Sequence, residues 1–122
     1  MQPKFIIVCE SAMTSKESNT LSLIGIFEQI NVEGLPAAIP KFTVVTKFEN
    51  GDGTLPYKVE ITDPEGVSVA KSEVDITFGP NRKSQNITNF LVLPFEKVGV
   101  HKVTAYVNGE TLLTTDIEVK IV

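Results

Sequence analysis

The chain has 122 residues, of which 42% are hydrophobic and 21% are charged, and its formal net charge at pH 7 is −4. A chain of this size and composition buries one core, so we expect a single domain over residues 1–122. The 11 Lys and Arg residues are scattered and no run approaches the roughly 20 apolar residues of a transmembrane helix, so we expect neither nucleic acid nor a membrane as partner.

Short apolar runs separated by turn residues begin at the N-terminus. Lys4–Glu10 alternates as a strand, with Phe5, Ile7 and Cys9 on the face expected to join the core. After a polar loop, Leu21–Ile30 is apolar on both parities. This pattern is typical of a strand that is covered on both sides rather than one that is half solvated.

The segment Asn31–Lys41 carries Pro36 and Pro40 and is predicted to be irregular, because proline cannot donate to a strand ladder. Alternating strands then follow at Phe42–Phe48 and Tyr57–Thr62.

The turn Asp63–Gly66 precedes another alternating run, Val67–Phe78, whose apolar residues change phase. The change of phase predicts a bulge near Lys71–Glu73. A further strand is expected at Gln85–Phe95.

The last quarter of the chain gives the strongest signal. Gly99–Val107 and Glu110–Val122 both alternate, and the dipeptide Asn108–Gly109 between them is well suited to the two positive φ values of a type I′ turn. The sequence therefore predicts an all-β protein, an immunoglobulin-like antiparallel sandwich of about eight strands in two sheets. The residues expected between the two sheets are Phe5, Ile7, Leu23, Phe27, Phe42, Val44, Tyr57, Val59, Ile61, Leu91, Leu93, Val103, Ala105, Val107, Ile117 and Val119.

Several motifs resemble one family of small, uncharacterised, mainly bacterial proteins, a domain of unknown function. The motifs are Ser22–Phe27, Leu35–Pro36, Asp63–Gly66, Gly99–His101 and Val107–Glu110. The resemblance spans nearly the whole chain and implies an immunoglobulin-like β-sandwich. It implies no catalytic or binding residue, and His101 departs from it because the family usually has an aromatic residue there.

The chain offers little for catalysis. Cys9 and His101 are the one thiol and the one imidazole, and both fall on parities expected to be buried. We therefore predict a non-enzymatic protein without cofactor or metal; a pH-dependent role of His101 is a minor alternative. Because a lone cysteine forms no intrachain disulfide, we also expect a cytoplasmic location.

Two loops are candidates for ligand binding. Glu49–Pro56 contains acidic and amide side chains around Gly51 and Gly53 but lacks the ligand spacing of an EF-hand, so that a loose calcium site is a remote alternative. Together with Gly79–Ser84, this loop is the rim at which a small ligand or a carbohydrate would bind.

The feature that says most about function is that several strands are apolar also at the alternate positions, which are expected to face outward. We predict an apolar outer face that binds a second copy of the chain or another protein, unless the segment Leu35–Pro40 covers it. The candidate interface residues are Ile24, Ile26, Ile30, Phe90, Val92 and Tyr106, with Val100 beside them.

Overall fold

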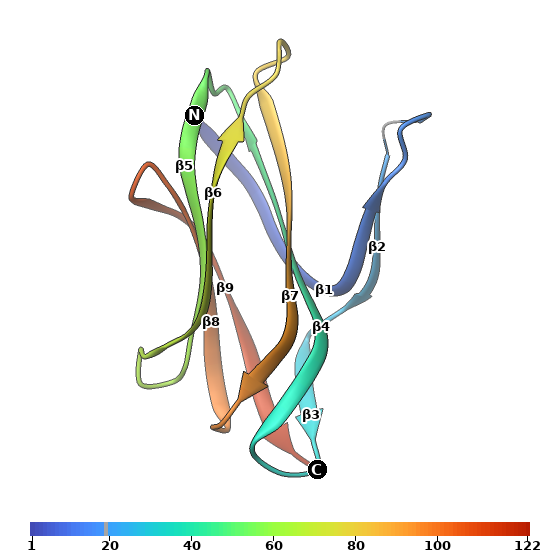
Figure 1. Cartoon of the computed structure of the whole chain (residues 1–122), viewed down its shortest axis with the longest axis vertical. Coiled ribbons are helices and arrows are strands. Elements are labelled where there is room, and N and C mark those ends of the chain that lie inside the picture. The colour runs from blue at the N-terminus through green and yellow to red at the C-terminus, as the bar shows by residue number, and fades with distance from the viewer. Residues whose placement is uncertain (19) are drawn as a thin grey trace.

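The structure, a computed structural model, describes residues 1–18 and 20–122; this part of the chain forms nine strands and no helix (Figure 1). The strands are β1 (Gln2–Thr14), β2 (Leu21–Ile26), β3 (Gln29–Val32), β4 (Ala37–Glu49), β5 (Thr54–Thr62), β6 (Ser68–Thr77), β7 (Lys83–Phe95), β8 (Gly99–Val107) and β9 (Glu110–Ile121). The predicted all-β sandwich is confirmed, with one strand more than the sequence suggested.

The strands form two sheets that face each other across the core. The four-stranded sheet has the order β2-β1-β4-β7, and the five-stranded sheet has the order β3-β9-β8-β5-β6. All the strand pairs are antiparallel except β3 with β9, which is parallel. The predicted single strand Leu21–Ile30 is therefore wrong: the chain leaves one sheet after β2, passes through Phe27 and Glu28, and joins the other sheet as β3.

The core contains most of the residues predicted for it, but Phe5, Ile7, Leu23 and Leu91 lie outside it. In β1 the residues that pack between the sheets are Ile6 and Val8, whereas Phe5 and Ile7 are half-buried on the other side. Because every residue from Phe5 to Cys9 is apolar, periodicity could not decide which face points inward. Leu91, also predicted to be buried, is 72% exposed.

The exposure of Leu91 follows from an irregularity that two neighbouring strands share. The segment predicted to be irregular becomes strand from Ala37 onward, because Ile39 and Lys41 pair with β7 on either side of Pro40. Opposite Pro40 lies Val92, with φ of 55°. The ladder is interrupted there, and the buried parity changes between Phe90 and Leu93, leaving Leu91 outside.

The change of phase in β6 is also displaced from its predicted position. The pairing between β5 and β6 shifts register between Ile61 and Thr62, opposite Val69, and is continuous through Lys71–Glu73. The bulge predicted at Lys71–Glu73 is therefore wrong.

The C-terminal hairpin has the predicted turn, and beyond it a register shift between Ala105 and Tyr106 that the sequence did not predict. Asn108 and Gly109 adopt φ values of 53° and 80°, and Val107 pairs with Glu110 around them. These are the two positive φ values of a type I′ turn, so the predicted turn is confirmed.

Candidate interaction surface

A two-stranded ribbon projects from the sandwich beyond the point where β1 leaves β4 (Figure 1). β1 pairs with β4 as far as Cys9, and its remainder pairs only with β2. We call this ribbon, Ser11–Thr14 with Leu21–Ile26, the arm. At its far end the Ser15 N–H donates a hydrogen bond of 2.9 Å to the Thr20 carbonyl.

Each face of the arm carries three apolar side chains, beside Ser11 and Ser22 on one face and Thr14 on the other. The register places Met13, Ile24 and Ile26 on one face, where their exposed fractions are 56%, 52% and 59%. The other face carries the half-buried side chains of Ala12, Leu21 and Leu23. An isolated two-stranded ribbon is at best marginally stable in water. Part of the apolar surface of this ribbon stays exposed, because the rest of the described chain does not cover it.

The first face of the arm continues the outer face of the four-stranded sheet, that is, the face turned away from the five-stranded sheet. Ile7, Val45 and Ile87 form one cross-strand row on it, and Cys9 pairs with Ile26 at the start of the arm. Val45 is fully buried, while Ile7 and Ile87 are half-buried. Sequence reasoning missed this row; the signal for it was the doubly apolar run at the N-terminus.

The base of the arm has several short contacts and lies beside a hollow. Gly25 has a φ of 68°, and the Glu10 side chain lies so close that a Cβ on Gly25 would be 2.7 Å from Glu10 Cδ. The Thr43 hydroxyl lies 2.8 Å from Asn89 Oδ1 and 3.2 Å from the Glu10 carbonyl. The hollow, of about 290 Å³, is lined by Glu10, Ser11, Lys41, Phe42, Thr43, Asn89, Phe90 and Leu91.

β2 is an edge strand without charge or proline, and its ladder with β1 is interrupted at Gly25, whose φ is 68°. Strand edges usually carry charges, proline or a bulge that prevents pairing with another chain. β6 has charged residues from Lys71 to Asp75, β7 has Pro94 and the irregularity at Val92, and β3 is only four residues long. β2 consists of Leu21-Ser22-Leu23-Ile24-Gly25-Ile26 and has neither charge nor proline.

The six predicted interface residues do not share one face. Ile24 and Ile26 lie together on the arm, but Ile30 is 3% exposed and belongs to the core on the other sheet. Their common parity was lost where the chain crosses between the sheets. Phe90 packs against the core, as its edge-on contact with Phe42 at 6.5 Å shows. The other two lie apart from the arm: Val92, 66% exposed on β7, and Tyr106, half-buried on the five-stranded sheet.

The segment Leu35–Pro40, expected as a cover for the apolar face, does not act as one. Its residues from Ala37 onward are part of β4 and pair with β7. Leu35, Ala37 and Ile39 pack against the core instead.

Cys9 and His101 lie on different sheets. Cys9 is fully buried, its Sγ is 3.3 Å from the Ser11 carbonyl oxygen, and burial raises the pKa of its thiol. His101 is 1% exposed, and its ring meets Phe95 edge-on at 5.0 Å. Nδ1 of His101 lies 3.1 Å from the Gly99 carbonyl oxygen, so Nδ1 donates the proton. Nε2 has no partner among the described residues.

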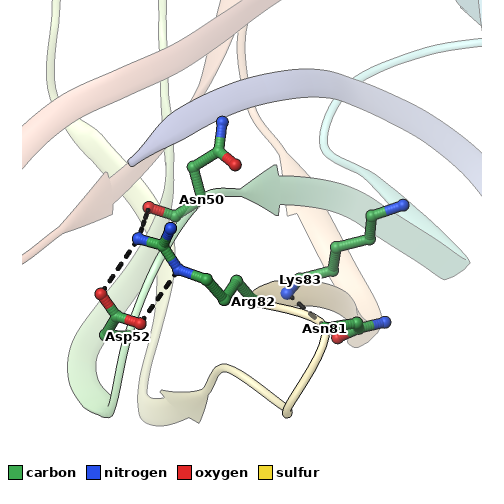
Figure 2. Close-up of polar contacts among 5 residues, drawn as sticks. All are labelled: Asn50, Asp52, Asn81, Arg82 and Lys83. Atoms are coloured by element: carbon green, nitrogen blue, oxygen red, sulfur yellow. Dashed lines mark hydrogen bonds and ion pairs between the residues drawn. The ribbon is translucent and has the colours of Figure 1, made fainter.

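The two rim loops are closed by contacts with each other (Figure 2). The Arg82 guanidinium donates to both carboxylate oxygens of Asp52 at 3.1 Å, and also to the Asn50 carbonyl at 3.3 Å. Asn81 Oδ1 accepts from the Lys83 N–H at 3.1 Å. Asp52, an acidic residue of the loop considered for calcium, thus pairs with an arginine. Within the described residues, no three His, Cys, Asp or Glu side chains gather as metal ligands.

An open groove of about 490 Å³ runs over β5, β6 and β8 on the five-stranded sheet. It is lined by Pro56, Tyr57, Lys58, Glu73, Val74, Asp75, Tyr106 and Gly109. The Lys58 ammonium lies 4.4 Å from the centre of the Tyr106 ring, so a cation–π contact covers one face of that ring.

Fold and surface together define a small two-sheet β-sandwich with a projecting apolar ribbon. The chain belongs to a protein family of unknown function, DUF6941, whose model matches residues 4–120. A comparison with curated proteins found no significant relative. In the described residues no helix is long and apolar enough to cross a membrane.

Two solved structures are similar to the chain in fold. One is the alkylpurine DNA glycosylase AlkC of Pseudomonas fluorescens bound to DNA containing an abasic site analog, with a TM-score of 0.52 and 14% identity over 94% of this chain and 30% of that chain. The other is a beta-glucosidase from Listeria innocua in complex with isofagomine, with a TM-score of 0.51 and 12% identity over 97% of this chain and 16% of that chain. The chain thus spans less than a third of either enzyme, and the likeness concerns the fold alone.

Proposed function

We propose that this protein is a non-enzymatic interaction module that binds another protein chain through the arm and the adjoining outer face. The observation that carries the proposal is that the arm has apolar side chains on both faces and extends beyond the sandwich. Contiguous apolar surface of this kind is rare on a soluble monomer and is typical of a protein interface. The absence of charge and proline from β2 supports the same proposal.

Further points of the proposal concern class and location. We place the sandwich in the immunoglobulin-like type and the protein in the cytoplasm, where a single reduced and buried cysteine is typical. A non-enzymatic role is supported by the separation of Cys9 from His101 and by the raised pKa of the Cys9 thiol, since the thiolate is the nucleophile.

Photo-crosslinking in cells tests the proposal. A benzophenone amino acid replaces Ile26, which is 59% exposed on the arm, or Val67, which is 58% exposed on a turn between β5 and β6. We expect irradiation to join the Ile26 variant to a protein chain and to leave the Val67 variant free. No adduct at Ile26, or equal adducts at both positions, would overturn the proposal.

The alternative is a small-ligand or carbohydrate binder, and one observation favours it. The groove at Tyr106 offers an aromatic ring beside Glu73 and Asp75, a combination that suits a polyhydroxylated ligand. Chemical-shift changes at Lys58 and Tyr106 on titration with oligosaccharides would support it. If saturating ligand causes no shift there, the alternative fails.

A further inference from the structure

We infer that the cavity beside His101 is a binding site for a small organic ammonium group, which donates an N–H to Nε2 of His101 and is neutralised by the Glu96 carboxylate. The cavity has a volume of about 180 Å³ and lies between the ends of the two sheets. The residues that matter in it are Val69 of β6, Pro94 of β7, His101 of β8, and Asp63, Glu96 and Lys97 of the adjoining turns. None of its lining residues belongs to the arm, so this site goes beyond the proposed function and does not depend on it.

The buried imidazole of His101 supplies the first step. The residue is 1% exposed, and its Nδ1 donates to the Gly99 carbonyl, so Nε2 of the neutral ring is a hydrogen-bond acceptor. Nε2 is buried and has no partner among the described residues. Buried polar atoms in proteins are nearly always hydrogen-bonded, either to the protein or to a bound molecule. Because the ring lines the cavity, the missing donor has to come from a molecule inside it.

The charged groups around the cavity supply the second step. The Asp63 carboxylate accepts hydrogen bonds of 2.9 and 3.0 Å from the N–H groups of Glu65 and Val67. The Lys97 ammonium lies 3.0 Å from Asp63 and 3.2 Å from Glu65, so these groups satisfy one another. No ion pair involves Glu96 within the described residues. Three carboxylates against one ammonium leave this cluster with a net charge of −2, which favours a cation as the occupant.

The size and the walls of the cavity supply the third step. A water molecule takes up about 30 Å³ in the liquid, so the cavity has the volume of about six waters. Val69 and Pro94 form apolar walls against which a few methylene groups can pack. Nε2 of His101 and the Glu96 carboxylate are then the acceptors left for an ammonium group. The occupant that fits is a short alkylammonium ion or the end of a lysine side chain.

The nitrogen-15 spectrum of the imidazole tests the inference directly, because His101 is the only histidine in the sequence and its two ring nitrogens need no further assignment. The probe is n-propylammonium chloride at about pH 8, where a primary amine is still an ammonium ion. We expect a saturable shift of the Nε2 resonance. Two other probes, 1-propanol, which has a donor but no charge, and tetramethylammonium, which has a charge but no N–H, should bind at least about tenfold more weakly.

Glu96 and Glu110 provide a matched pair of variants, because both side chains are exposed and each change to glutamine removes one negative charge. Glu110 lies beside the turn at the other end of β8. Glu96→Gln should weaken the binding of n-propylammonium about tenfold, and Glu110→Gln less than about twofold. His101→Phe, which keeps a ring beside Phe95, should abolish saturable binding, as followed by the amide resonance of Val69.

A capped tripeptide with a central lysine identifies the source of the ammonium group. Tighter binding of this peptide than of n-propylammonium indicates a polypeptide as the source, whereas weaker binding indicates a free amine; the same peptide with its lysine acetylated should not bind. Either order supports the inference. If Nε2 does not respond to n-propylammonium, or responds equally to 1-propanol, the cavity holds water only and the inference is overturned. Equal binding by the Glu96→Gln and Glu110→Gln variants would also overturn it.

Discussion

Two β-hairpins of the chain, the arm near the N-terminus and β8–β9 at the C-terminus, differ in how their apolar faces are covered. In β8–β9 one parity is buried against the other sheet, with Val103 and Ala105 at 0% exposure, and the other parity carries residues such as Lys102. In the arm, both parities carry apolar side chains. A hairpin with one polar face buries its apolar residues within its own chain, whereas the arm leaves Met13, Ile24 and Ile26 more than half exposed.

The first prediction compares the loss of stability when one isoleucine in each hairpin is truncated to alanine. Ile117→Ala in β9, where the side chain is 2% exposed, should lower the free energy of unfolding by about 2 to 5 kcal/mol. Ile24→Ala in the arm, at 52% exposure, should change it by less than about 0.5 kcal/mol in dilute solution. Urea denaturation measures both, and equal losses would mean that the arm is packed within the monomer.

The second prediction concerns Nε2 of His101 in β8, a buried nitrogen without a hydrogen-bond partner among the described residues. His101→Phe should raise the stability by about 1 kcal/mol, because a buried polar atom without a partner costs more than the single bond to Gly99 contributes. The aromatic ring keeps its contact with Phe95.

A matched control removes a polar atom that does have a partner. The Tyr57 hydroxyl lies 2.6 Å from the Thr46 hydroxyl in the core, so Tyr57→Phe should lower the stability by about 1 to 2 kcal/mol. If His101→Phe lowers stability as well, Nε2 has a partner in solution, in the adjoining cavity of about 180 Å³ beside Asp63 and Lys97.

The third prediction compares a glycine from each hairpin. Gly109 at φ 80° and Gly25 at φ 68° both adopt a conformation that costs an L-residue about 1 kcal/mol. Gly109→Ala should show this cost in full, because the turn is fixed on both sides by paired strands. Gly25→Ala should show less of it in dilute solution, because the arm can open without unfolding the sandwich and the exposed Glu10 side chain can move away from the added Cβ. Equal midpoints in thermal denaturation would contradict this difference.

The same contrast explains which parts of the structure the sequence could predict. The alternation around Asn108–Gly109 predicted the turn and the buried parity of each strand, because one parity was mainly apolar, but it did not predict the register shift between Ala105 and Tyr106 that brings the two buried parities to one face. Where both parities are apolar, as from Phe5 to Cys9, periodicity carries no information about facing. The grouping of Ile30 with Ile24 and Ile26 failed for a different reason: the crossing between sheets at Phe27 and Glu28 is a tertiary event that no local pattern encodes.

The fourth prediction has the smallest effect and concerns how the two hairpins are anchored. Just before β8, the Lys97 ammonium lies 3.0 Å from Asp63 and 3.2 Å from Glu65, which ties the C-terminal hairpin to the turn after β5. No ion pair involves the arm within the described residues. The Val67 N–H, followed by Lys97, lowers the pKa of the Asp63 carboxyl below its usual value of 3.8, and Asp63, followed by Glu65, raises the pKa of Lys97 above its usual 10.5.

The sign of the pH dependence follows from these directions. Asp63 contributes stability above pH 3.8, and the contribution is lost as the pH falls through its lowered pKa. Lys97 contributes below pH 10.5 and loses its contribution as the pH rises through its raised pKa. Asp63→Asn should therefore flatten the acid limb of a plot of urea midpoint against pH, and Lys97→Met the alkaline limb. Added salt should shrink both differences, because the Lys97 and Glu65 side chains are 39% and 72% exposed, although that of Asp63 is only 9% exposed. Salt-independent differences would instead indicate that the contacts are shielded from solvent.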